Sequence, residues 1–187
     1  MIELIYKIEL LSDWHCGSGL SAGSDVDALC IKDENGLPFI PGKTLKGLLK
    51  EAAEIITEFS NDIKSDFLKI CFGEQTDKNS TQSDTGKCYF SNGELTVSVK
   101  TALNSSDSDK KSVLFRKISS TEIDADGQAV DHSLRKIETT VPLVLFAKIT
   151  GLPNEYLENI KMCLKWVKRL GTNRNRGLGR CKLSVFK

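Results

Sequence analysis

The N-terminal segment alternates apolar and polar side chains, which is the pattern of a strand. Within residues 3–11, every second residue from Leu4 to Leu10 is apolar, and Ile5 adds one apolar side chain to the opposite face. The next stretch, SDWHCGSGLSAGSDVD, is rich in Gly, Ser and Asp and is longer than an ordinary turn. Long loops in compact domains often carry function, so this loop becomes the first candidate site.

Two later segments show the three-to-four-residue apolar spacing of amphipathic helices. The first begins near Thr44 and keeps this spacing as far as Phe59. The second covers residues 154–170, and Gly171 supplies its C-terminal stop. Each helix is expected to pack one apolar face against a sheet.

Further strands are predicted around these helices, at residues 87–90, 94–100, 141–150 and 179–186. Together with the N-terminal strand they give the order strand, helix, strands, helix, strand. This order predicts an α+β sandwich of ferredoxin type.

The length of the chain supports one sizeable core. With 187 residues and 40% hydrophobic content, we expect a single domain over residues 1–187. Insertions are expected at residues 75–85 and 101–138, because the tracts 75–85 and 104–112 are too polar to form a core and are interpreted as exposed loops.

Overall charge and cysteine content exclude several classes of protein. Lys plus Arg (26) nearly balances Asp plus Glu (25), so any basic surface must be local. The six cysteines form no C-x-x-C pair, which favours buried reduced thiols over a disulfide framework or a zinc site. The chain shows no membrane-length apolar run and no signal peptide, so a cytoplasmic protein is expected.

Two familiar glycine patterns do not qualify as nucleotide sites. The segment GLPFIPGKT has the wrong glycine spacing for a phosphate-binding loop, and its prolines remove backbone donors. The glycines at positions 17, 19 and 23 also miss the dinucleotide spacing.

A third glycine pattern, GTNRNRGLGR at residues 171–180, is more informative. It places Arg174, Arg176 and Arg180 among three glycines directly after the predicted second helix. Glycines allow close approach of the backbone to an anion, and guanidinium groups bind phosphate through two parallel hydrogen bonds. A helix C-terminus attracts one or two cations by itself, but three arginines in seven residues favour an RNA contact.

Several segments, taken together in order and spacing, resemble the RAMP superfamily over almost the whole chain. These segments are LPFIPGKTLKGL (37–48), FG (72–73), GKCYFSNGEL (86–95), GTNRNRGLGRCKL (171–183) and TEIDADGQAVDHSLRKIE (121–138), the last of which is similar to the thumb region of backbone subunits.

The resemblance implies a modified ferredoxin-like (RRM-like) fold with inserted loops and a thumb hairpin. It also implies a role as a CRISPR-RNA-binding backbone subunit of a type III effector complex. In such complexes, copies stack along the guide RNA and push their thumbs between bases. The implied partners are CRISPR RNA, complementary target RNA, other effector subunits and further copies of the chain, joined head to tail.

The resemblance also assigns candidate residues to the RNA. Besides the arginine loop, Lys43 and Lys46 lie in the predicted first helical turn, where backbone N–H groups also favour anions. Arg135 lies in the thumb region. His15, in the long loop, is assigned a structural or guide-positioning role. For the two lysines, a solvated helix face is the alternative.

Asp27 falls where target-cleaving members of the family carry an aspartate needed for metal-dependent RNA cutting. A carboxylate there would hold Mg²⁺ with help from substrate phosphates. The alternative is that Asp27 is an ordinary turn-forming residue of a Gly/Ser loop.

Three function classes therefore remain open: a backbone subunit that binds guide RNA and cleaves target RNA, a processing endoribonuclease of CRISPR RNA, and a non-catalytic capping subunit. Processing enzymes normally carry two tandem ferredoxin-like folds, whereas this chain has the motif set once.

Overall fold

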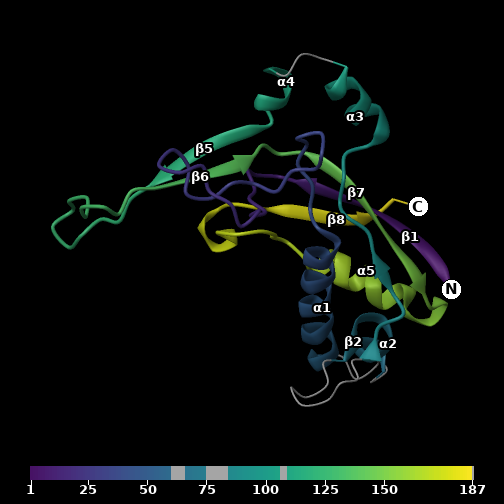
Figure 1. Ribbon diagram of the computed structural model, residues 1–187. Coiled ribbons are helices and arrows are strands. Elements are labelled where there is room, and N and C mark those ends of the chain that lie inside the picture. Colours follow the sequence, from purple (N-terminus) through teal and green to yellow (C-terminus); the bar gives the residue numbers. More distant parts are fainter. Residues whose placement is uncertain (60–65, 75–83, 106–108, 187) are drawn as a thin grey trace.

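The fold is built on a four-stranded antiparallel sheet in the order β4-β7-β1-β8 (Figure 1). Counted along the chain, the first strand lies between the third and the fourth, and the second is at the edge. This is the strand order of a ferredoxin-like fold, and it confirms the predicted α+β class. The strands are β1 (Ile2–Leu10), β4 (Tyr89–Phe90), β7 (Val144–Leu152) and β8 (Cys181–Val185). The computed structural model describes residues 1–59, 66–74, 84–105 and 109–186.

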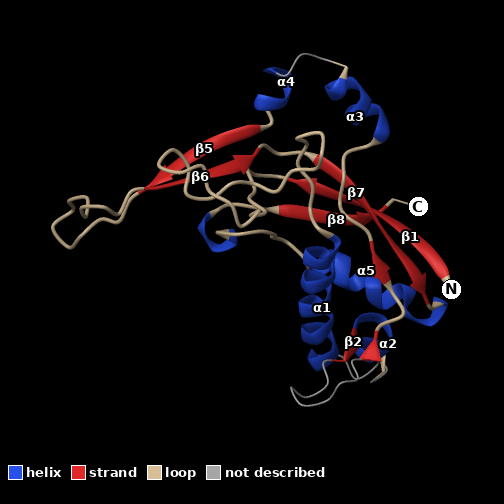
Figure 2. Ribbon diagram, viewed as in Figure 1, coloured by secondary structure: helices blue, strands red, loops and turns tan. Residues whose placement is uncertain are grey.

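Two helices, α1 (Gly42–Phe59) and α5 (Leu157–Trp166), cover one face of this sheet (Figure 2). The alternation in β1 explains why: its buried side chains recur at every second position from Leu4 to Leu10. Ile8 pairs with Leu145 and Leu183 on the neighbouring strands, and all three are buried. Each such side chain contributes about 1.5–3 kcal/mol to stability through burial.

The start of α1 is held by a residue far away in the sequence. The side-chain oxygen of Asn92 accepts the backbone N–H of Gly42 at 2.8 Å. This contact satisfies one of the N–H groups that the first helical turn leaves without an intrahelical partner. The IPGKT segment is therefore a helix start, fixed against the loop that follows β4.

The strand predicted at residues 94–100 is wrong. Only Glu94 pairs with the sheet, opposite Phe146, and the chain then forms α3 (Val97–Asn104). Val97 and Val99 are exposed, so their alternation buries no strand face. The Lys100 ammonium lies 2.6 Å from a Glu94 carboxylate oxygen, which ties the helix back to the sheet edge.

The second predicted helix is shorter than its apolar pattern suggests. A 3₁₀ turn, η1 (Asn154–Tyr156), leads into α5, which ends at Trp166. Residues 167–170 are extended, because the Leu170 N–H bonds to the Gly179 oxygen and the Cys181 N–H bonds to the Lys168 oxygen, each at 2.9 Å. Val167 and Leu170 are buried as expected, although they lie outside the helix.

A two-stranded hairpin, β5 (Phe115–Ser120) and β6 (Arg135–Thr140), projects from the sheet (Figure 1). Residues 121–132 at its tip are all exposed. The hairpin contains residues 121–138, the segment for which the family resemblance implied a thumb.

Shorter elements complete the described chain: α2 (Phe67–Phe72), β2 (Gly73–Glu74), β3 (Asp84–Thr85), α4 (Asp109–Ser112) and η2 (Arg174–Arg176). Most of the polar tract 75–85, and residues 106–108 of the second tract, lie outside the described residues. All six cysteines are free and buried, as predicted. Among the described helices, none combines the length and apolarity of a membrane span.

The arginine loop at residues 171–180 is closed by glycines at both ends. A Cβ on Gly179 would lie 1.8 Å from the backbone oxygen of Leu170, and one on Gly171 would lie 2.3 Å from that of His15. Both glycines have positive φ, +67° and +81° respectively. Glycine at these positions lets the loop turn tightly against its own base.

We predict that Gly179→Ala lowers the free energy of unfolding by more than about 2 kcal/mol, because the backbone must move to admit a methyl group. Gly177→Ala is the matched control: its φ is also positive, +93°, but nothing lies within 4 Å of the added Cβ. It should cost only the left-handed strain of about 1–2 kcal/mol. Urea unfolding measures both, and equal losses would show that the Gly179 contact does not close the loop.

Candidate nucleic-acid interface

His15 lies where three segments of the chain meet. Its Nδ1 is 2.6 Å from the backbone oxygen of Glu138 in β6, and its own carbonyl accepts the N–H of Thr172 at 2.9 Å. The residue is only 3% exposed. The buried imidazole joins the long loop to the hairpin, and the backbone carbonyl of the same residue joins it to the arginine loop.

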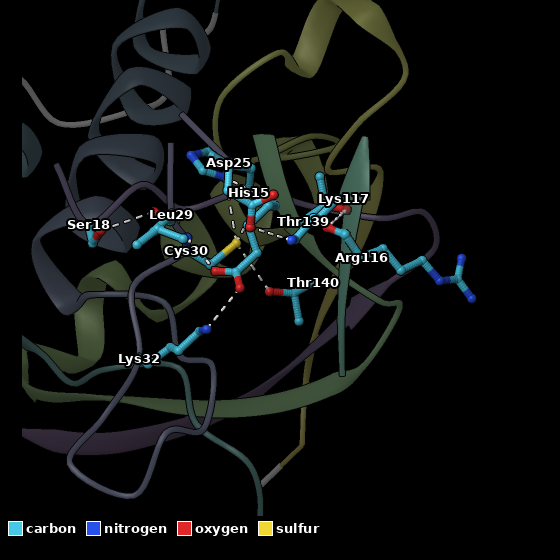
Figure 3. A network of polar contacts seen from close by, with 11 residues as sticks. His15, Ser18, Asp25, Leu29, Cys30, Lys32, Arg116, Lys117, Thr139 and Thr140 are labelled. Atoms are coloured by element: carbon cyan, nitrogen blue, oxygen red, sulfur yellow. Dashed lines mark hydrogen bonds and ion pairs between the residues drawn. The ribbon is translucent and has the colours of Figure 1, made fainter. Parts of the chain in front are cut away.

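Glu138 organises the contact between the long loop and the hairpin. Figure 3 labels its partners His15, Cys30 and Lys32. One carboxylate oxygen accepts the backbone N–H of Cys30 at 2.9 Å, and the other accepts the Lys32 ammonium at 2.9 Å. That ammonium also lies 3.9 Å from the centre of the Phe115 ring in β5. The Lys32 ammonium therefore combines a charge-assisted hydrogen bond to β6 with a cation–π contact to β5, and so contacts both hairpin strands.

Asp27 lies beside β6, and its side chain is exposed. Its N–H donates to the Lys136 oxygen at 2.8 Å, and its Oδ2 accepts the Lys136 N–H at 2.7 Å. Asp25 points to a different partner, Lys117, at 2.6 Å. The hydrogen bond and charge of Lys117 hold the pKa of Asp25 below its usual value. The two aspartates are thus distinguished: Lys117 neutralises Asp25, whereas Asp27 contacts a backbone amide.

These acidic residues do not form a multidentate metal site. Across residues 1–59, 66–74, 84–105 and 109–186, the structure brings together no group of three or more His, Cys, Asp or Glu side chains suited to a metal ion. Any cation at Asp27 would need most of its ligands from elsewhere.

A pocket of about 360 Å³ opens at the N-terminal end of α1. His15 and Gly17 form one wall, Lys43 and Gly47 of α1 form another, and Thr172 closes it from the arginine loop. The exposed Lys43 side chain and the positive end of the α1 helix dipole give this end of the helix a positive potential.

Lys46 does not join Lys43 at this pocket. It lies toward Cys88 on another side of α1, where a hydrogen bond from Cys71 and the charge of Lys46 lower the pKa of the Cys88 thiol. Residues three apart are close on a helix surface, yet Lys46 is not among the residues that line this pocket. The structure thus separates two residues that the sequence had grouped.

A second pocket, of about 330 Å³, adjoins the first, and both are lined by Leu48 and Glu51. Here Arg174 forms a two-pronged ion pair with Glu51, with both N···O distances at 3.2 Å. Arg169 lines the same pocket and donates to the Arg174 carbonyl. The two adjoining pockets are called the α1 groove; its charged and imidazole side chains are His15, Lys43, Glu51, Lys168, Arg169 and Arg174.

The other predicted arginines do not line the α1 groove. Arg176 and Arg180 are exposed, and within the described part of the chain neither side chain forms an ion pair or hydrogen bond. Arg135 begins β6 beside the projecting tip, opposite Ser120. Three of the predicted RNA-contact residues, His15, Lys43 and Arg174, therefore line the α1 groove, and the others lie outside its lining: Lys46, Arg135, Arg176 and Arg180.

Sequence reasoning missed Glu51 and Glu138. Glu51 could have been found, because Lys43, Gly47 and Glu51 recur at four-residue spacing and so share one helix face. Glu138 carries no such signal, since its partner Cys30 is 108 positions away along the chain.

Comparison with known proteins finds a matching family and two similar structures, each over nearly the whole chain. The family model for the RAMP superfamily matches residues 7–182. A chain of the type III-B Cmr-beta complex bound to cognate target RNA, solved by cryo-EM, superposes with a TM-score of 0.70 at 15% identity, covering 99% of this chain and 97% of that one. A chain of the apo state of type III-B Cmr-beta gives 0.67 at 15% identity, with coverage of 100% and 98%. No curated protein matches.

We predict that Glu138→Ala lowers the free energy of unfolding by about 2–3 kcal/mol, because it leaves the Cys30 N–H unpaired and removes the partner of Lys32. Glu138→Gln keeps one acceptor oxygen and should cost only about 1 kcal/mol. Urea unfolding of both variants provides the measurement. Glu34→Ala, at an exposed carboxylate, is the control and should change stability by less than about 0.5 kcal/mol. Similar values for all three would mean that Glu138 does not hold the loop.

Proposed function

The chain belongs to the RAMP superfamily, and from this premise we propose that it is a CRISPR-RNA-binding backbone subunit of a type III interference complex. The observation that carries the proposal is the α1 groove. It gathers Lys43, Arg169 and Arg174 from three parts of the sequence beside one helix. The fold is shared with a chain of a complex that contains target RNA.

The groove suits a phosphate backbone better than a base sequence. Its cationic groups are guanidinium and ammonium ions, which recognise phosphate without reading base edges. A guide-binding subunit must accept any guide sequence, so contacts of this kind fit the proposed role.

Glu51 gives the groove a resting state. In the free protein Glu51 forms an ion pair with Arg174, although both side chains are substantially exposed, at 41% for Arg174 and 52% for Glu51. Ion pairs this exposed contribute little, about 0.2–1 kcal/mol. An RNA phosphate can therefore replace the carboxylate, and Glu51 keeps the arginine loop oriented until it does.

The hairpin supplies the thumb of the proposed subunit. Its tip exposes Ile123, Val130 and Leu134, apolar side chains of the kind that wedge between stacked bases. The tip is held in shape by Asp124, whose Oδ1 accepts the Gln128 N–H at 2.8 Å. An ordered projection with an apolar end is suited to interrupting a guide–target duplex at regular intervals.

The same arrangement supports a proposal for assembly. We propose that copies stack head to tail along the RNA, each thumb reaching its neighbour, in a heterologous contact that does not close on itself. Other type III effector subunits would complete the complex, which would act in the cytoplasm.

Target cleavage with Mg²⁺ is proposed for Asp27. Its Oδ1 accepts no hydrogen bond from the described residues, whereas Oδ2 is held by the Lys136 amide. Mg²⁺ commonly binds one or two carboxylates and completes its coordination shell with water and substrate phosphates. The free oxygen of Asp27 would therefore be one ligand, and RNA phosphates and water would supply the others. When bound, the ion would offset charge developing on the scissile phosphate. The Lys136 amide positions the carboxylate beside the start of β6, near the tip end of the hairpin.

We predict that Arg176→Ala lowers the affinity for single-stranded RNA severalfold and reduces the salt slope of log K by about 0.7, the value for one lost phosphate contact. Glu51→Gln should raise the affinity about two- to fivefold, because Arg174 no longer has to leave a carboxylate. Fluorescence anisotropy across a salt series measures both quantities. Lys148→Ala, which also removes one positive charge but on β7 away from the groove, is the control. An unchanged slope in Arg176→Ala would contradict the assignment of the loop.

We predict that Asp27→Asn abolishes Mg²⁺-dependent cutting of guide-paired target RNA but leaves guide binding within about twofold, because no phosphate contact is lost. Asparagine keeps an oxygen that can accept the Lys136 N–H, so the melting temperature should not change. Labelled target RNA and the assembled complex provide the assay.

Asp25→Asn is the internal control, because it removes the exposed pair with Lys117 and should leave cutting intact. Loss of cutting in Asp25→Asn alone would place the catalytic carboxylate two residues earlier. If neither variant alters cutting by an active complex, this loop has no catalytic role.

A further inference from the structure

The α1 groove continues past Arg174 into an apolar hollow. This hollow has a volume of about 800 Å³ and is lined by Ile56, Phe59, Met162, Lys165, Trp166 and Lys168. Trp166 and Lys168 also line the groove, so the two depressions share a wall. A ligand lying in the groove could enter the hollow without leaving the surface.

Large apolar side chains are exposed in this hollow. Trp166 is 51% exposed, Phe59 84% and Met162 46%. Trp166 is the last residue of α5, and it lies outside the buried stripe of that helix, which consists of Ile160, Cys163 and Leu164. The fold therefore does not use the indole as core, and clustered exposed apolar groups of this kind mark a binding surface.

The charges around the hollow are of one sign. Among the described residues that line it, the two charged ones are Lys165 and Lys168, and neither makes an ion pair with another described residue. Arg169 follows directly in the adjoining groove. An aromatic surface with cations beside it is the combination that binds single-stranded nucleic acid, because bases stack on the ring while the cations hold phosphates.

We propose that the hollow is a base-stacking subsite, in which one unpaired base of the bound RNA stacks on the indole of Trp166 while Lys168 and Arg169 hold its flanking phosphates. The inference rests on the proposed RNA-binding function and adds a site to it. The continuous path from Arg174 to Trp166 favours RNA as occupant over a protein segment. Because every base has a flat face, such a site is also compatible with any guide sequence.

The two tryptophans of the chain make the test direct. Trp14 is 1% exposed, and its Nε1 donates to the Val141 oxygen at 3.1 Å, so RNA cannot stack on it. Titrating the full chain with a mixed-sequence, unstructured RNA oligonucleotide should quench tryptophan fluorescence in proportion to binding. Inorganic polyphosphate, which has no bases, should compete for the groove without quenching.

Substitution separates stacking from charge. Trp166→Leu should lower RNA affinity about tenfold while leaving the salt slope unchanged, because a stacking contact is lost and no phosphate contact is. Trp166→Phe should retain most of the affinity. Trp166→Leu removes an exposed side chain, and its melting temperature checks that the fold is intact.

The outcomes distinguish this proposal from the one it rests on. If RNA binds with a normal salt slope but causes no quenching, and Trp166→Leu binds as tightly as the unaltered chain, the stacking site is wrong while RNA binding stands. If the unaltered chain does not bind RNA at all, the proposed function itself fails. If Trp166→Leu keeps its RNA affinity but no longer joins the assembled complex, the hollow is a protein interface and the stacking proposal is overturned.

Discussion

The candidate interface depends on the contacts of Glu138, because they reinforce the backbone pairing of the long loop with β6. Its carbonyl contacts His15, and its carboxylate holds the Cys30 amide and the Lys32 ammonium. Closing a loop of more than a hundred residues costs entropy, and a cluster of short, partly buried polar contacts offsets that cost locally. The backbone carbonyl of His15 in turn accepts the N–H of Thr172, at the base of the arginine loop. One residue of β6 thus positions the long loop directly and the arginine loop indirectly.

This arrangement explains how a chain with a net charge of +1 can present a strongly basic groove. Lys43 comes from the start of α1, Arg169 from the extended arm after α5, and Arg174 from the loop beyond it. Folding brings the three together, while many acidic residues pair with lysines elsewhere, as Glu3 does with Lys148 and Asp25 with Lys117. The exception is Glu51, which shares the groove and keeps Arg174 oriented until a competing anion arrives. Local grouping therefore gives the surface an electrostatic character that the average composition conceals.

The groove and its extension divide the recognition of RNA into two physical tasks. Near Lys43 and Arg174 the side chains are cationic and suit phosphate, whereas near Trp166 they are apolar and suit the face of a base. The extended arm connects the two regions, and it exists because its backbone pairs with residues 179–181 instead of continuing α5. The early end of that helix thus exposes Trp166 at one end of the arm and sets the arginine loop at the other.

The sequence by itself determined the elements whose side chains follow a local period. The alternation in β1 and the apolar spacing of α1 predicted both elements to within a few residues, and the order of elements with the family motifs predicted the ferredoxin-like class. The strand expected at residues 94–100 failed because Val97 and Val99 alternate without being buried, and the second helix was overextended because Val167 and Leu170 are buried in an extended arm.

Only the tertiary structure decided which candidates share a site. It joined Lys43 to the arginine loop, placed Lys46 on another surface, and assigned Asp25 and Asp27 different partners. It also revealed the long-range contacts of Glu138 and the exposure of Trp166. Periodicity reports which face of an element is buried, but contacts between residues a hundred positions apart arise from packing, which no local pattern in the chain records.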